Sequence, residues 1–484
     1  MRAVLVGLLV ALLPYDLDAQ QAPPPPNVVL ILADDAGWGD FGCYGQRRIR
    51  TPNIDRLAAE GLRFTDFYAG GTVCVPSRCA LFTGKHPGHM SLRINVTQPL
   101  PEEELTLAEI LQAAGQRTAC IGKWALGNSV SQGSPRAQGF ETYFGYIDQN
   151  LAHRYYPPFL LRDDERVVYD DNPQARTHYS QDLFTEEALR FLEASASEAN
   201  RARPFFLFLS YCLPHADLDV PEDSAAPYRA LGWPERAYVE SGGKRLYNDQ
   251  PTPRATYAGM LTRLDREVGR VLDALRELGL DENTLVLFSS DNGPTDEGGS
   301  DPEFFQSAGP FRGLKGELYE GGIRVPLIAR WPKTVAPGTS ALPCAMWDLL
   351  PTLVELAGAL VPSGIDGLSL VPTLRGRAGE QRAHDALYWE NIGPGPSHVQ
   401  ALRRGSWKAV RRGVHGRNPR VELYDLATDP GEAKDVAAEH AELVEELTAL
   451  IEDAHIADPK SPLTWAELNG RPNRKPGKKG AEPK

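Results

Sequence analysis

The sequence predicts an α/β protein with a large, mostly parallel sheet flanked by helices and a smaller C-terminal α+β subdomain built on a short antiparallel sheet. Two observations support this prediction. Continuous apolar runs at 27–33, 204–210 and 284–290 are typical of strands buried on both faces. Segments with helical spacing lie between them, at 54–62, 105–114, 186–194 and 257–280, and strands that alternate with helices form parallel sheets.

Shorter signals complete the predicted order of elements. Apolar runs at 118–122 and 325–330 predict two further strands, whereas the aromatic and polar segment 129–176 is expected to be irregular and to line a substrate pocket. After Pro372 the pattern changes to short strands at 387–390, 407–411 and 421–426 and a closing helix at 443–454. We therefore expect a catalytic domain at 23–374, the α+β subdomain at 375–465 and a basic, disordered tail at 466–484.

The N-terminal residues predict export. Arg2 precedes an apolar run at 3–13, and Ala19 or Ala22 is a suitable cleavage position, so residues 1–22 have the features of a secretory signal. The apolar run is too short to cross a bilayer as a mature helix. We expect a secreted or periplasmic protein without stable membrane insertion.

The overall charge and the cysteine count narrow the class of protein. The formal net charge is −13, which argues against nucleic-acid binding, and an anionic substrate would need a local basic pocket. Six cysteines are too few to form a disulfide scaffold in a chain of 484 residues.

The stretch from Cys74 to Gly84 has the features of a nucleophile at the start of a helix. Pro76 suits the first helical position, which places Cys74 near the N-cap, where backbone N–H groups and the helix dipole favour an anion. Arg78 can reach the same spot, and a thiol there is expected to have a lowered pKa. A cysteine-dependent phosphatase would need an arginine at position 80, which is Ala80, and a buried structural cysteine remains the alternative.

Polar side chains follow the predicted strands at their carboxyl ends. Ligands of open α/β sheets bind outside this edge. Six polar residues occupy it by sequence position: Asp34, Asp35, Lys123, His215, Asp291 and Asn292. Their coincidence, rather than any one residue, indicates a functional site.

The pattern C-x-P-S-R-x-x-L-x-T-G, complete at 74–84, resembles the signature of the type I, formylglycine-dependent sulfatases, an arylsulfatase-like family of the alkaline phosphatase superfamily. The resemblance extends from about residue 27 to residue 435. It implies that a formylglycine-generating maturation enzyme oxidises Cys74 to formylglycine (3-oxoalanine). The hydrate of that group would attack a sulfate ester.

The same resemblance assigns roles to the other site residues. The metal ligands would be Asp34, Asp35, Cys74 in its modified form, Asp291 and Asn292. Such hard oxygen donors suit Ca²⁺, or Mg²⁺, rather than zinc. Arg78, Lys123 and Lys315 would hold the sulfate and so supply the local basic pocket, and His215 or Lys315 would protonate the departing alcohol.

One position departs from the family pattern. The usual Gly-Lys-Trp-His-Leu-Gly has Ala125 in place of its histidine, which in the family contacts the formylglycine and acts as a base when sulfate leaves. We predict that His153, in the aromatic segment, takes over this role. The competing interpretation is that the loss of this histidine has reduced the activity of the enzyme.

The expected substrate is a sulfated sugar or glycan, or an aryl sulfate. An exported protein with aromatic loops favours a saccharide, and Arg93, Asn95 and Tyr155 are predicted to contact it. The alternative enzyme is a formylglycine-dependent phosphonate monoester or phosphodiester hydrolase. A carbohydrate-binding protein without turnover is the alternative outside catalysis.

Overall fold

The computed structural model describes residues 25–95, 98–127, 133–147, 149, 151–240, 247–392, 398–458 and 463. The predicted signal at 1–22 and the predicted tail at 466–484 lie outside the described residues. Within this part of the chain, no helix combines the length and the apolar character that a membrane span requires.

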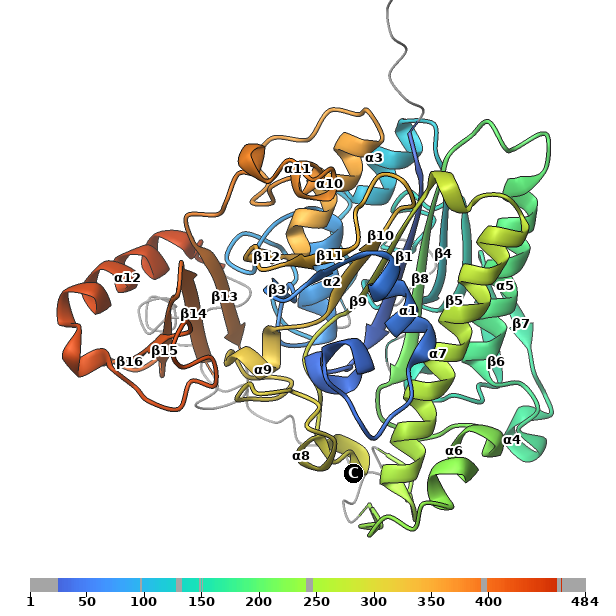
Figure 1. Ribbon diagram of the computed structural model, residues 1–484, viewed down its shortest axis with the longest axis horizontal. Coiled ribbons are helices and arrows are strands. Elements are labelled where there is room, and N and C mark those ends of the chain that lie inside the picture. The colour runs from blue at the N-terminus through green and yellow to red at the C-terminus, as the bar shows by residue number, and fades with distance from the viewer. Residues whose placement is uncertain are drawn as a thin grey trace, which may run out of the picture.

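A ten-stranded sheet forms the centre of the larger domain (Figure 1). Its five central strands are parallel: β9 Thr284–Ser290, β1 Asn27–Asp34, β8 Phe205–Pro214, β4 Arg117–Lys123 and β5 Thr142–Tyr146. One flank continues with β10 Leu327–Arg330, β2 Leu62–Phe64 and β11 Gly338–Ser340, and the other with β6 Phe159–Arg162 and β7 Glu165–Val168. Antiparallel pairing occurs only at β10, β6 and β7 among the described strands of this sheet, which confirms the predicted fold class.

Helices cover both faces of the sheet, which explains the continuous apolar runs of its central strands. In β1, Val28 and Leu30 belong to one core, whereas Val29 and Ile31 belong to the other. The first core is closed by α2 Cys74–Thr83, α3 Leu107–Ala113 and α10 Leu349–Leu356. The second is closed by α1 Pro52–Glu60, α5 Ser180–Ala196 and α7 Pro253–Glu277 (Figure 1).

The C-terminal part forms a separate four-stranded antiparallel sheet (Figure 1, brown to red). Its strands are β13 Leu387–Ile392, β14 His398–Arg404, β15 Trp407–Arg412 and β16 Arg420–Asp425, each paired with the next. The helix α12 Ala441–Ala454 packs on this sheet through Leu447 and Ile451. The small antiparallel sheet predicted from the sequence is therefore confirmed, while the domain boundaries stay a prediction.

Shorter elements connect these layers. The strand β3 Phe67–Tyr68 pairs with β12 Cys344–Ala345. The short helices are α4 Asn172–Ala175, α6 Glu222–Arg229, α8 Pro302–Phe305, α9 Glu320–Ile323 and α11 Val371–Leu374.

The expectation of an irregular segment at 129–176 is wrong. This segment supplies β5, the β6–β7 hairpin and α4. These strands are short, and β7 is largely exposed, so no continuous apolar run marks them in the sequence. All six cysteines are free, as expected for a chain without a disulfide scaffold.

Buried charges join the two parts of the molecule. Lys408 of β15 places its Nζ 2.8 Å from Oε1 of Glu320 on α9 and 2.9 Å from Oε1 of Glu432, and all three side chains are fully buried. Arg324 holds the other oxygen of Glu320 at 3.0 Å. Burial and the neighbouring Glu320 raise the pKa of Glu432 to about 7, against the opposing effect of Lys408.

Candidate active site

Six polar side chains from the carboxyl ends of the parallel strands meet at one edge of the main sheet. Each of the six is at most 2% exposed. The register of the central strands brings their ends level, since Leu32 of β1 pairs with Ser210 of β8 and Ser289 of β9. The six are Asp34 and Asp35 at the end of β1, Lys123 at the end of β4, His215 after β8, and Asp291 and Asn292 after β9.

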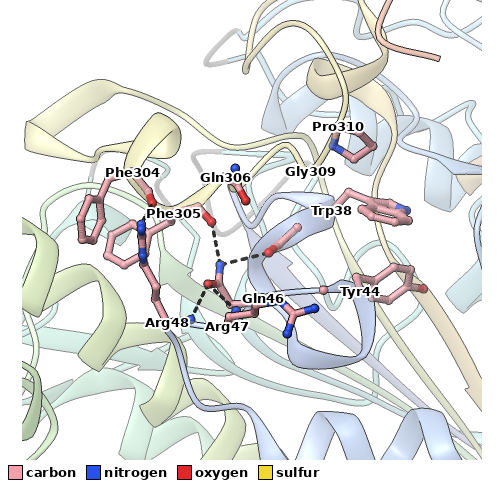
Figure 2. A pocket seen from close by; sticks show the side chains of 12 residues that line it. Trp38, Tyr44, Gln46, Arg47, Arg48, Phe304, Phe305, Gln306, Gly309 and Pro310 are labelled. Atoms are coloured by element: carbon pink, nitrogen blue, oxygen red, sulfur yellow. Dashed lines mark hydrogen bonds between the residues drawn. The ribbon is translucent and has the colours of Figure 1, made fainter. Parts of the chain in front are cut away.

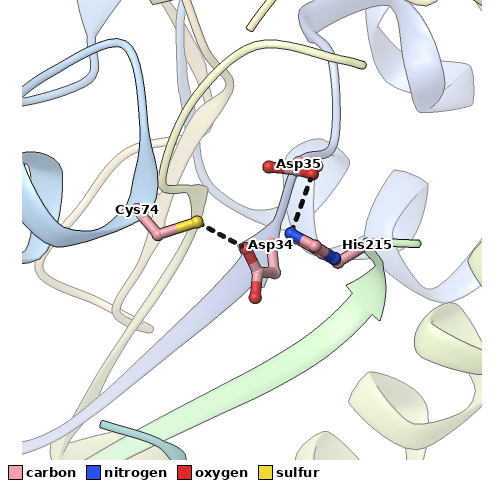
Figure 3. A group of neighbouring side chains, drawn as sticks. All are labelled: Asp34, Asp35, Cys74 and His215. Atoms are coloured by element: carbon pink, nitrogen blue, oxygen red, sulfur yellow. Dashed lines mark hydrogen bonds and ion pairs between the residues drawn. The ribbon is translucent and has the colours of Figure 1, made fainter. Parts of the chain in front are cut away.

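Cys74 lies at the same place, as the first residue of the buried helix α2 (Figure 3). Its Sγ is 3.4 Å from Oδ1 of Asp34. Val73, rather than Cys74, is the N-cap, and Pro76 is the third helical residue rather than the first. The shift is tolerated because the first four N–H groups of a helix have no partner within it.

The predicted lowering of the Cys74 pKa is wrong. Burial and the neighbouring Asp34 carboxylate raise the pKa of this thiol well above its usual value, although Lys123 and Lys315 act in the opposite direction. As a plain thiol, Cys74 is therefore protonated and a poor nucleophile at neutral pH.

Two cations neutralise Asp34 in the buried centre of the site. Nζ of Lys123 lies 2.6 Å from Oδ2 of Asp34, and the guanidinium of Arg78 lies 3.8 Å from the same oxygen. Burial alone would raise the pKa of Asp34, but the charges of Lys123 and Arg78 outweigh it and hold the pKa well below its usual range. Asp34 is therefore ionised.

Arg78 is fixed from several sides. It binds Oδ2 of Asp291 through Nε at 3.2 Å and Nη2 at 3.0 Å, and it donates to the Lys123 carbonyl at 2.8 Å and the Ser210 hydroxyl at 2.6 Å. Burial and the nearby Asp34 raise the pKa of Asp291. The guanidinium thus has a fixed orientation, 3.8 Å from the Asp34 carboxylate that also contacts the Cys74 thiol.

Asp35 organises the other half of the site. Its Oδ2 accepts from Nζ of Lys315 at 2.8 Å and lies 3.4 Å from Nε2 of His215, and its Oδ1 accepts from the Asn292 amide at 2.7 Å. Lys315 and Nε2 of His215 are 3.1 Å apart. Burial and the charge of Lys315 lower the pKa of His215 well below its usual value, so this ring is neutral.

His153 lies beside this group, although it comes from the short helical turn 151–153 in the aromatic segment. Its ring stacks on His215 with 4.3 Å between centroids and an interplanar angle of 20°. Its Nε2 is buried and has no hydrogen-bond partner among the described residues. Burial, and to a smaller extent the charges of Lys123 and Lys315, lower the pKa of His153 to about 2.

The three residues predicted to contact substrate lie in different surroundings. Asn95 is exposed and its Oδ1 accepts from the Val75 N–H at 3.0 Å, next to the start of α2. Arg93 is buried and binds Glu390 of β13 at 2.9 Å, so its guanidinium joins the two parts of the molecule. Tyr155 has a buried ring, and its hydroxyl donates to the carbonyls of Cys212 (2.8 Å) and His215 (2.6 Å), so its contact with substrate stays a prediction.

Sequence reasoning missed two residues of this site. Ser210, which holds Arg78, ends the predicted strand 204–210 and could have been found by the rule that located the other strand-end residues. Glu297 lies 3.6 Å from Lys315 and accepts from the Tyr247 hydroxyl at 2.8 Å. It begins the short helical turn 297–299, four residues beyond Gly293, and no sequence signal distinguishes it from Asp296 beside it.

The strand-end carboxylates fit a hard divalent cation. Ligand atoms of Asp34, Asp35, Cys74 and His215 lie within 4.8 Å of one another, and Asp291 accepts from the Asp35 backbone N–H at 3.2 Å. Asn292 Oδ1 is buried without a partner in the described part of the chain. Several carboxylate oxygens and an unpaired amide oxygen form the donor set that Ca²⁺ or Mg²⁺ prefers.

Known proteins are similar to almost the whole length of this chain. The Sulfatase family profile matches residues 26–359, and a profile described as N-sulphoglucosamine sulphohydrolase, C-terminal, matches residues 314–456. Arylsulfatase A of Homo sapiens is 34% identical over 451 residues, which cover 84% of this chain and 82% of the relative. N-acetylgalactosamine-6-sulfatase of Homo sapiens is 32% identical and covers 94% of this chain and 91% of the relative.

Solved structures match the fold over a similar range. The crystal structure of Ps i-CgsB in complex with k-i-k-neocarrahexaose superposes with a TM-score of 0.75 at 28% identity. The match covers 89% of this chain and 92% of the other chain.

Proposed function

Because this chain belongs to the sulfatase family, we propose that it hydrolyses the sulfate ester of a sulfated saccharide, using a formylglycine formed from Cys74 and a bound Ca²⁺. The observation that carries the proposal is the convergence of a buried nucleophile position, three cations and a set of hard oxygen ligands at one sheet edge. The family membership by itself supports the hydrolysis of sulfuric esters. The modification, the ion and the saccharide are our proposals.

The state of Cys74 supports the modification. An unmodified thiol here is protonated, because burial and Asp34 raise its pKa, so it would attack sulfur poorly. A formylglycine at this position would supply, as its hydrate, one hydroxyl that attacks sulfur and a second whose deprotonation expels sulfate. Formation of this group requires a maturation enzyme as a partner.

Asp34, Asp35, Asp291 and Asn292 would hold the cation together with residue 74. When bound, Ca²⁺ would supply positive charge that offsets the charge of the sulfate oxygens and favours ionisation of the hydrate. Two of these carboxylates form ion pairs in the structure: Asp34 with Lys123 at 2.6 Å and Asp35 with Lys315 at 2.8 Å.

The remaining residues act through charge and proton transfer. Arg78, Lys123 and Lys315 are already in position to hold sulfate oxygens, so little reorganisation is needed as charge develops. Nζ of Lys315 and Nε2 of His215 are 3.1 Å apart, and one of these atoms would protonate the departing alcohol. Nε2 of His153 is the atom that we assign to accept a proton when sulfate leaves.

A saccharide substrate is supported by the relatives. The names N-acetylgalactosamine-6-sulfatase and arylsulfatase A stand for two substrate classes, and a structural neighbour was crystallised with k-i-k-neocarrahexaose. Asn95 is exposed beside the start of α2, where it can reach substrate hydroxyls. We propose that the protein is secreted or periplasmic, where such glycans occur.

Mass spectrometry of the peptide that carries residue 74, combined with an activity panel, tests this proposal. Formylglycine replaces the –CH₂SH of cysteine by –CHO, so the peptide mass changes. Hydrolysis of p-nitrophenyl sulfate and of sulfated mono- and oligosaccharides should exceed hydrolysis of an aryl phosphodiester. An unmodified thiol in the mature protein would refute the mechanism, and faster turnover of the phosphodiester would favour the phosphodiesterase alternative.

Removal of divalent ions tests the metal site by a readout other than activity. A ligand that binds only the folded state raises the melting temperature. Chelation followed by re-addition of Ca²⁺ should lower and then restore it. An Asn292→Ala variant whose melting temperature still responds to Ca²⁺ as strongly as the wild type would contradict the assignment.

The role of His153 is tested with His153→Ala, and His178→Ala, at a half-buried histidine outside the site, is the matched control. Loss of a general base lowers turnover by about 100-fold or more. If His153 serves only sulfate release, the first turnover should still liberate p-nitrophenol at the normal rate, followed by slow later turnovers. Unchanged steady-state turnover in His153→Ala would reject the assignment.

A further inference from the structure

A cavity lies apart from the active-site residues, between two loops that continue from β1 and β9 (Figure 2). Its volume is about 420 Å³, in the range of sites that hold small organic ligands. One wall comes from the segment 38–48, with its two short helical turns, and the other from α8 and the residues 306–310. None of the active-site side chains described above lines it.

The two walls are fixed to each other by one side chain. Gln46 donates from Nε2 to the carbonyls of Gly39 (3.1 Å) and Phe305 (2.9 Å), and its Oε1 accepts from the backbone N–H groups of Arg47 and Arg48, both at 2.9 Å (Figure 2). The side chain thus uses its full hydrogen-bonding capacity within the protein. The cavity is therefore preformed, and the two arginines project from an anchored backbone.

The cavity favours an anion. Two of its twelve lining residues are arginines and none is acidic, although the whole chain carries a net charge of −13. The guanidinium of Arg48 lies 4.3 Å above the Phe304 ring and binds the Phe304 carbonyl, which holds it in place. The guanidinium of Arg47 is exposed and has no partner in the described part of the chain, so its planar set of donors is available for a carboxylate or sulfate.

The cavity also offers apolar surface. Trp38 and Phe304 are half-buried and line it, together with Pro310. An adjoining cavity of about 360 Å³ shares Arg48, Phe304 and Gln306 with the first. It adds Arg236 and Arg254 but also Asp301 and Glu303, and Asp301 binds Nε of Arg254 at 2.9 Å, so the preference for an anion rests on the first cavity. An inorganic ion would fill only a small part of this volume and leave the aromatic surface unused. A sugar with an acidic substituent matches both features, because its C–H faces pack on rings and its charged group binds arginine.

We propose that this cavity is a second binding site for an anionic saccharide, with Arg47 and Arg48 as its charged contacts. The preference for an anion follows from the lining, whereas the choice of a saccharide rests on the proposed function. The site would hold a glycan by a part distant from the ester that reacts.

The test is calorimetric titration of the Cys74→Ala protein, which cannot form the aldehyde, with a chondroitin sulfate tetrasaccharide. Two binding events are expected. Arg47→Ala in this background should weaken one event by tenfold or more and leave the other, since a hydrogen-bonded charge pair contributes a factor of about this size. Arg382→Ala removes the same charge from an exposed position elsewhere and serves as the control.

The outcomes are distinct. Identical isotherms for the Arg47 and Arg382 variants would overturn the proposal, as would equal affinity for neutral chitotetraose. Suppression of the Arg47-dependent event by millimolar inorganic sulfate, with no gain in affinity from the sugar, would reduce the site to an ion site and refute the saccharide. Two events in a wild-type protein that hydrolyses no sulfate ester would keep this site and refute the proposed function instead.

Discussion

Replacement of Lys408 by methionine should destabilise the protein strongly, because this lysine neutralises two carboxylates that have no access to water. Its Nζ contacts Glu320 at 2.8 Å and Glu432 at 2.9 Å, and the three side chains are fully buried. Methionine has a similar volume, so the substitution removes the charge without leaving a large cavity. Glu320 and Glu432 would then repel each other in the interface between the two sheets.

The structure sets the size of the effect. Loss of one partner of a buried ion pair costs about 3–5 kcal/mol. Glu320 keeps Arg324 at 3.0 Å, so we expect the lower end of this range, about 3 kcal/mol. Glu432 has a raised pKa of about 7, and this pKa should rise further without Lys408. At pH 8, Glu432 is then protonated in the folded variant but ionised in the folded wild type. The destabilisation should therefore be larger at pH 8 than at pH 6.

Urea unfolding of Lys408→Met and of a matched control measures this difference. Lys333 also forms a Lys–Glu pair, with Glu282 at 2.6 Å, but the two side chains are 74% and 73% exposed. Exposed pairs contribute about 0–1 kcal/mol, so Lys333→Met should unfold almost like the wild type. Equal losses in the two lysine variants, or a loss at pH 6 that exceeds the loss at pH 8, would show that the buried cluster does not act as described.

Two further substitutions give clear expectations. Asp40 is buried and accepts from Gly37 N and the Tyr257 hydroxyl, both at 2.7 Å, and burial raises its pKa to about 6. A raised carboxyl pKa stabilises the fold below pH 4, and this stability is lost as the pH rises to 6. Asp40→Asn should therefore remove about 3 kcal/mol from the pH dependence of the unfolding free energy between pH 4 and pH 6. Urea unfolding measures this, and an unchanged dependence on pH would contradict the expectation. Tyr155→Phe leaves the His215 carbonyl without its hydrogen-bond donor, so kcat should fall while KM changes little. The free energy of unfolding should drop by about 1–3 kcal/mol. An unaltered kcat would show that Tyr155 does not position His215 for catalysis.

The fold was predictable where the sequence contains long apolar runs. The strands at 27–33, 204–210 and 284–290 were found because burial on both faces leaves mostly apolar runs without charged residues. The strand β14 and the β6–β7 hairpin were missed, since they mix charged and apolar residues and their pairing depends on neighbours distant in the chain.

The site was predictable to the extent that it follows from strand ends. Asp34, Lys123 and Asp291 follow apolar runs directly, and parallel pairing then brings them together. The surroundings of Tyr155 and the high pKa of Cys74 depend on burial by distant segments, which local sequence does not reveal. His153 lies beside His215, while both its substitution for the histidine missing at Ala125 and its role stay predictions.

The complete burial of α2 has a consequence for how the protein is made. All ten residues of this helix are inaccessible, and the Cys74 side chain has no exposed surface. The maturation enzyme that we propose could therefore reach this segment only before the chain folds. Maturation and folding would then compete in time, and a chain that folded first would keep its thiol. The active fraction of a preparation would be set during synthesis, and faster folding would lower it.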